Sequence, residues 1–181
     1  MRIKTKWHKD KEGKSLEESA SVMGFVAWRA AMNGLNQMEN DGFRTDSYSH
    51  QLEIIAEFVA FELQVADRLA YIRLEDEDRQ AFISTLAGHL IEHTVDNMLD
   101  VQGPGDYRPV VIEKLNNRAA EYAELKFQGE EPGYPFLSHL GRCVDGIMGG
   151  EKNKFAIEFA AEVIGPDLVK TLRKSVADLL D

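Results

Sequence analysis

The sequence predicts an all-α fold, a bundle of four long helices with about three shorter C-terminal helices packed on it. Three observations indicate this. Apolar residues recur with the 3.6-residue period of a helix over long segments. Helix-capping residues, prolines and glycines stand where these segments begin and end. The chain contains no convincing run of alternating apolar and polar residues that would build a sheet.

Seven helices are predicted, at about residues 15–38, 47–73, 75–102, 109–127, 136–148, 152–164 and 167–180, the third of them beginning near either Glu75 or Asp78. Ser15 opens a capping box (S-x-x-E) at the start of the first helix. Asp46 or Ser47 caps the second helix. The third helix ends before a Gly-Pro-Gly turn at residues 103–105, and the fourth opens with Pro109, a residue that suits a first helical turn.

Glycine and proline divide the C-terminal third into shorter segments. Residues 129–135 are a loop by their local sequence. The paired glycines 149–150 end the fifth helix. Gly165 and Pro166 are expected to end the sixth helix and to start the seventh.

Charge is distributed unevenly along the chain. The first 14 residues hold six lysines and arginines against Asp10 and Glu12, a net charge of +4. The whole chain carries −10, so residues 15–181 carry −14. We therefore expect a basic N-terminal arm over residues 1–14 and a single all-helical domain over residues 15–181. The arm is either a solvated tail or a segment that lies on an acidic face of its own body or of a second subunit.

The composition also limits the partners and the compartment. An acidic body repels the phosphates of nucleic acids and anionic membranes, so neither is an expected partner. A single cysteine, Cys143, excludes an intramolecular disulfide and favours a reducing compartment. No signal peptide and no long apolar run is recognisable, and we expect a cytoplasmic protein.

The segment from residue 87 to residue 100 is the strongest candidate for chemistry. His89, His93, Asp96 and Asp100 follow one stripe along the third predicted helix. Side chains four residues apart on a helix are close enough to share one ion. Imidazole and carboxylate groups are ligands of zinc, iron and manganese. The stripe therefore predicts a divalent metal site, with Glu92 as a general base.

The letters from His89 to His93 spell H-x-x-E-H, which resembles the zinc motif of the inverzincin metallopeptidases. The resemblance implies that His89 and His93 bind zinc and that Glu92 activates water for hydrolysis. It covers seven residues. It does not imply the peptidase fold, because those enzymes carry the motif in mixed α/β domains. Non-haem iron chemistry is the competing interpretation of the same residues.

The alternative to a metal site is that His89 and His93 border the core and form hydrogen bonds with neighbouring groups. Glu62 also has two interpretations, because it projects from the apolar arc of the second helix. It either pairs with Arg29, the lone cation of the first helix, or completes the metal site. Glu57, in contrast, shares the polar side of the helix and is expected to be solvated.

His139 and Cys143 form a second pair four residues apart. Both are expected in the core, or else His139 activates the thiolate or joins a zinc site. His139 could be a further ligand of the stripe if the helix at 136–148 packs on the helix at 75–102. The alternative to a metal protein is a non-catalytic homo-oligomer or adapter, which would associate through apolar helix faces or the basic arm.

Overall fold

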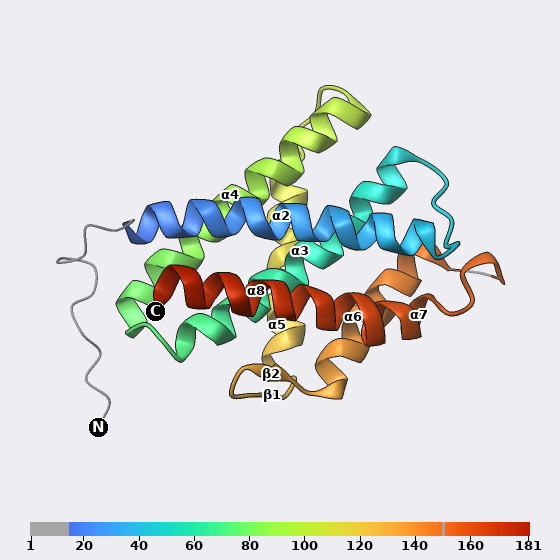
Figure 1. Cartoon of the computed structure of the whole chain (residues 1–181). Helices are drawn as coiled ribbons and strands as arrows, with labels where there is room; N and C mark the ends of the chain where they lie inside the picture. The colour runs from blue at the N-terminus through green and yellow to red at the C-terminus, as the bar shows by residue number, and fades with distance from the viewer. Residues whose placement is uncertain (1–14, 150) are drawn as a thin grey trace.

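The computed structural model describes residues 15–149 and 151–181, and its helices confirm the all-α prediction (Figure 1). The expected basic arm at residues 1–14 lies outside the described residues. The helices, in chain order, are α2 (Leu16–Asn40), α3 (Tyr48–Tyr71), α4 (Asp76–Gln102), α5 (Arg108–Ala123), α6 (Tyr134–Met148), α7 (Ala156–Phe159) and α8 (Gly165–Leu180). None of the described helices is long and apolar enough to cross a membrane.

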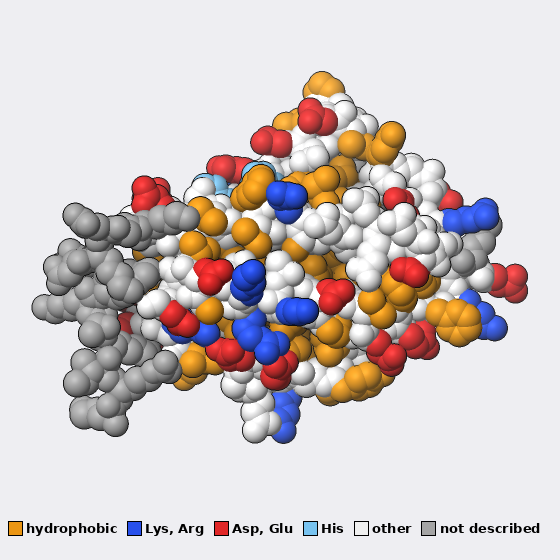
Figure 2. Space-filling model, in the orientation of Figure 1, with side chains coloured by type: hydrophobic (Ala, Val, Ile, Leu, Met, Phe, Trp, Pro, Cys, Tyr) orange, Lys and Arg blue, Asp and Glu red, His pale blue; other side chains and the backbone are white. Residues whose placement is uncertain are grey.

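Helix α3 is the centre of the fold. It is buried along most of its length and contacts α2, α4, α5, α6 and α8. Helices α2 and α8 lie side by side over one face of it (Figure 1). The later helices α6 and α8 share one core with the long helices and do not form an outer layer. On the face drawn in Figure 2, acidic, basic and apolar side chains are mixed over α2 and α8.

Three of the predicted helix starts, those of α2, α3 and α5, are confirmed, whereas the helix expected from residue 152 begins as α7 at Ala156. The Ser15 hydroxyl accepts a hydrogen bond from the Glu18 backbone, and the Glu18 carboxylate accepts one from the Ser15 backbone, which completes the capping box. Ser47, the second of the two candidates, caps α3 by accepting from the His50 backbone N–H. Pro109 stands in the first turn of α5, as expected.

Two predictions about helix ends are wrong. Helix α5 ends at Ala123 and not near Phe127, because β1 (Phe127–Gln128) and β2 (Glu131–Pro132) form a small antiparallel hairpin. The Phe127 ring packs on that of Phe136, which holds the hairpin against α6. Arg73 and Arg173 pair with the two glutamates of the hairpin, Glu130 and Glu131.

The second difference lies at Gly165 and Pro166, which do not end a helix. The chain passes from α7 through a π-helical turn, Ala160–Ile164, directly into α8. The ring of Pro166 would clash with the carbonyl group four residues before it, and proline has no N–H with which to bond it. The wider π-helical turn leaves room for the ring. Gly165 fits here because an added Cβ would meet the Leu137 side chain at 2.9 Å.

Candidate functional site

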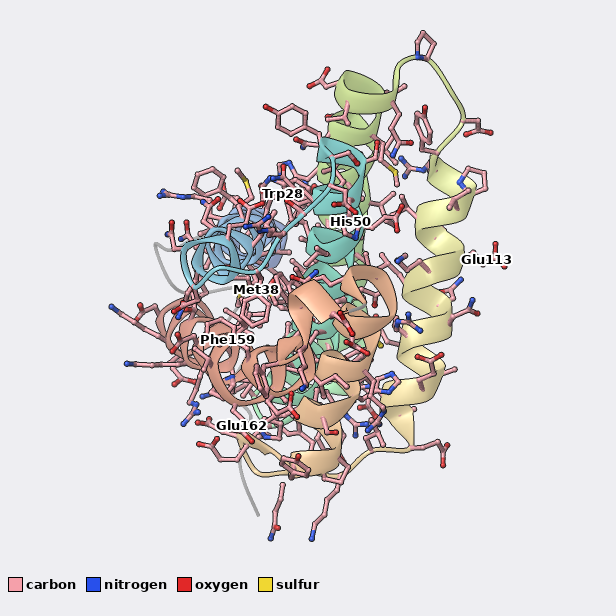
Figure 3. The ribbon with its side chains drawn as sticks, turned by 90° about the vertical axis from the view of Figure 1, so that its right-hand side faces the viewer. Trp28, Met38, His50, Glu113, Phe159 and Glu162 are labelled. Atoms are coloured by element: carbon pink, nitrogen blue, oxygen red, sulfur yellow. The ribbon has the colours of Figure 1, made fainter. Side chains whose placement is uncertain are left out.

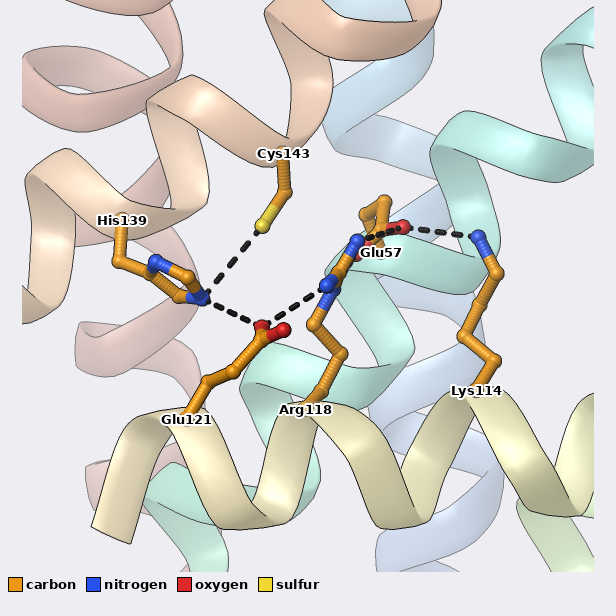
Figure 4. A network of polar contacts seen from close by, with 6 residues as sticks. All are labelled: Glu57, Lys114, Arg118, Glu121, His139 and Cys143. Carbon is orange, nitrogen blue, oxygen red and sulfur yellow. Dashed lines mark hydrogen bonds and ion pairs between the residues drawn. The ribbon is translucent and has the colours of Figure 1, made fainter. Parts of the chain in front are cut away.

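Helix α5 presents a polar row to α3 and α6. Lys114, Arg118 and Glu121 lie at intervals of four and three residues, so they share one face of the helix. The opposite face is turned outward, and Figure 3 shows Glu113 pointing away from the body of the protein. The row connects Glu57 of α3 with His139 and Cys143 of α6 (Figure 4). These six residues are the candidate site.

Glu57 anchors one end of the site, and the expectation that it is solvated is wrong. Its side chain is only 2% exposed. Lys114 Nζ donates to Oε1 at 2.7 Å, and Arg118 donates through Nε to Oε2 at 2.7 Å and through Nη2 to Oε1 at 2.9 Å. Burial alone would raise the pKa of Glu57, but the hydrogen bonds and charges of the two cations outweigh it and lower the pKa below its ordinary value. Glu57 is therefore a paired, buried carboxylate.

Glu121, His139 and Cys143 form the other end. His139 Nε2 lies 2.9 Å from Glu121 Oε2 and 3.6 Å from Cys143 Sγ. Among the described residues, these three supply the one group of potential metal-ligand atoms that all lie within 4.8 Å of one another. A histidine nitrogen, a thiol and a carboxylate could together hold a metal ion.

The same three residues do not form a nucleophilic triad. In a triad the carboxylate holds one ring nitrogen and the nucleophile meets the other. Here both neighbours contact Nε2 of His139. Burial, followed by the charge of Glu57, raises the pKa of the Cys143 thiol to about 11, so the thiolate is not favoured at neutral pH.

Neighbouring side chains hold these groups in position. Arg118 Nη1 donates to Glu121 Oε2 at 2.8 Å. Burial would raise the pKa of Glu121, but the hydrogen bonds from Arg118 and His139 lower it. The Tyr122 ring meets the His139 imidazole edge-on, with 4.8 Å between the ring centres. The imidazole is thus oriented by contacts with α5.

The α4 stripe has a different environment. His89 and His93 are half-buried, and Glu92 and Asp96 are exposed. The His93 ring stacks on Trp28 of α2, with 5.7 Å between the ring centres and 28° between the planes. His89 lies against Gly24 of α2, and a Cβ atom added to Gly24 would lie 3.0 Å from the Cβ atom of His89. Both histidines therefore border the contact between α2 and α4.

Among the described residues, no other predicted ligand joins this stripe in a group of potential metal-ligand atoms. Glu62 is 1% exposed, and neither of its oxygens has a hydrogen-bond partner in the part of the chain that the structure describes. Burial raises its pKa well above the ordinary value. The expected pairing with Arg29 is wrong, because Arg29 is exposed and its guanidinium carbon lies 5.6 Å from the centre of the Phe25 ring.

His139 does not reach the stripe either. That expectation required α6 to pack on α4, but α6 packs on α3 and on the segment formed by α7 and the π turn. His139 meets Glu121 of α5, a residue that the sequence did not single out. The order of charges on α5, with Glu121 three residues after Arg118, is a common surface pattern and gave no specific signal.

Comparison with known proteins identifies no family: no family model, no curated protein and no solved structure matches the chain. The function of the protein must therefore be inferred from the site itself.

Proposed function

We propose that this protein binds one divalent ion of the zinc class through Glu121, His139 and Cys143. The observation that carries the proposal is the separation of 3.6 Å between Cys143 Sγ and His139 Nε2. Zinc bonds of about 2.3 Å to sulfur and about 2.05 Å to nitrogen, at a tetrahedral angle, place these two atoms about 3.6 Å apart. The pair thus already has the spacing of two zinc ligands.

The third ligand needs a small adjustment. The gap of 2.9 Å between His139 Nε2 and a Glu121 oxygen would open to about 3.4 Å around a tetrahedral zinc ion. Glu121 is exposed, so its side chain has room to move. A carboxylate has two oxygens, and one can keep the hydrogen bond from Arg118 while the other binds the metal.

A metal ion would also resolve a conflict at His139. One ring nitrogen cannot donate a proton to Glu121 and accept one from Cys143 at the same time. A zinc ion takes the lone pair of Nε2 and replaces both contacts. Sulfur and nitrogen ligands favour zinc, and after it iron, over manganese.

The ligand number indicates the chemistry. Three protein ligands leave a fourth position open, which is the arrangement of catalytic zinc sites. A zinc ion at such a position activates a bound water, so metal-assisted hydrolysis is the reaction class that we assign to this site.

The α4 stripe is the second candidate. His89, His93 and Asp96 supply two imidazoles and one carboxylate, the ligand set of non-haem iron sites, and all three lie on α4. Glu92, exposed between the two histidines, would then be the base. The stacking of His93 on Trp28 uses the face of the imidazole, whereas a metal would bind in the ring plane through a nitrogen at its edge.

Metal analysis separates the two candidates. Protein purified without a histidine tag is loaded with zinc and dialysed. Its bound zinc is then measured by elemental mass spectrometry. We expect one zinc per chain, lost in Cys143→Ser and in His139→Ala and retained in the matched control His89→Ala/His93→Ala. Circular dichroism confirms that each variant is folded. Retention in both α6 variants would overturn the proposal, and loss in the control would favour the stripe.

The alternative of a non-catalytic homodimer has an observation of its own. The end of α4 projects beyond the body (Figure 1), and exposed apolar side chains, Leu99, Val101, Val110 and Ile112, lie at this end and at the start of α5. Light scattering tests the idea. A dimer that Val110→Glu dissociates would support it, and a monomer at all concentrations would contradict it.

A further inference from the structure

We infer that the open position of the proposed metal site takes a phosphate group, so that the ligands of this protein are phosphate or its monoesters. The inference depends on the proposed metal function and adds the class of substrate. It is based on the hollow beside the three ligands, which has a volume of about 380 Å³ and lies between α3, α5 and α6.

The hollow gathers cations on an acidic protein. Lys114, Arg118 and Arg142 line it together with His139 and Cys143, whereas the chain as a whole carries −10. Glu57 and Glu121 leave these three cations with one unbalanced positive charge. A zinc ion with the Cys143 thiolate would add a further positive charge, and an anion would neutralise the excess.

The cations also have donors to spare. Within the described part of the chain, Arg118 uses three of its five N–H groups on Glu57 and Glu121, which leaves two. Lys114 uses one of three on Glu57, and Arg142 uses one of five on Ser138. The free donors come from two helices, α5 and α6, on two sides of the hollow.

This donor set favours phosphate over a carboxylate. A metal-bound phosphate has further oxygens for guanidinium and ammonium groups, and arginine forms paired hydrogen bonds to it. A carboxylate bound to the metal has a single oxygen left, too few for three cations. The hollow is open to solvent, which suits a phosphate at the end of a larger molecule.

Cobalt substitution tests both steps in one sample. Cobalt(II) replaces zinc in the purified protein, and its bond to the Cys143 thiolate gives a charge-transfer band in the near ultraviolet. Inorganic phosphate, phenyl phosphate and acetate are then titrated while the visible ligand-field bands are recorded. We expect saturable spectral changes with both phosphates and only weak ones with acetate.

Variants locate the anion. Arg142→Gln is expected to weaken phosphate binding about ten-fold or more, with the thiolate band unchanged, because Arg142 is exposed and, among the described residues, donates only to Ser138. Arg29→Gln on α2 is the matched control and should bind phosphate as the wild type does. A thiolate band without any response to phosphate, or with an equal response to acetate, overturns this inference alone. The absence of the band overturns the metal proposal itself.

Discussion

Glu62 is a buried carboxyl group without a partner, and replacing it is expected to change how the stability of the protein depends on pH. Its side chain is 1% exposed, and no described group bonds to either oxygen. Burial raises its pKa well above the ordinary value of 4.5, because nothing replaces the lost hydration. The folded protein therefore keeps the proton at pH values where the unfolded chain releases it.

The sign of the effect follows from this difference in proton binding. Below pH 4.5 both the folded and the unfolded chain keep the proton on Glu62, and the protein has its full stability with respect to this group. That stability is lost as the pH rises from there toward the folded-state pKa of Glu62. Across that window the free energy of unfolding falls by up to about 1.4 kcal/mol for each pH unit. The unpaired carboxyl costs a further ~1–3 kcal/mol even when it is protonated.

Urea unfolding of the wild type and two variants, from about pH 4 to about pH 8, measures both effects. Glu62→Gln cannot ionise and should lose the part of the pH slope that Glu62 causes. Glu62→Met removes the unpaired polar group as well and should be about 2 kcal/mol more stable than Glu62→Gln at neutral pH. Glu53→Gln, an exposed position on the same helix, is the control and should keep the slope. Equal slopes in the wild type and in Glu62→Gln would refute the reasoning.

Three further predictions concern stability. Glu57→Ala should lower the free energy of unfolding by about 3 kcal/mol in urea titrations, because it leaves two cations without their buried partner. Because the pKa of Glu57 is lowered in the folded state, its stabilising contribution should be lost as the pH falls through that pKa. Gly141→Ala should lower the melting temperature, since its methyl group would meet the Ile157 carbonyl, whereas Gly146→Ala has open space and should gain up to about 1 kcal/mol. Ser15→Ala should cost about 1 kcal/mol in thermal unfolding through loss of the capping box.

The parts of the fold that the sequence predicted correctly are those set by local chemistry. A capping serine and a first-turn proline act within a few residues, so the starts of α2 and α5 could be placed. The end of α5 depends on Phe127 and Phe136, whose rings meet only after α6 has folded back. The continuity across Pro166 depends on a π turn, for which the sequence carries no comparable local signal.

The candidate site shows the same division between local and distant contacts. His139 and Cys143 could be paired from the sequence because they are four residues apart on one helix. Glu121 could not be added, since it is 18 residues from His139 and comes near only where α5 packs beside α6. Glu57 was assigned to a solvated face because its two cations are 57 and 61 residues away along the chain.

The α4 stripe illustrates why helical spacing alone is weak support for a metal site. Periodicity can place His89 and His93 on one face, but it does not say what that face meets. Gly24 lets α2 approach closely at His89, and Trp28 offers a ring on which His93 stacks. These contacts account for the half-buried positions of both imidazole rings without a metal ion. At His139 the second helix instead brings a carboxylate to the nitrogen that also faces the thiol. Ligands from two helices that converge on one atom are therefore the stronger ground for a metal site than ligands repeated along one helix.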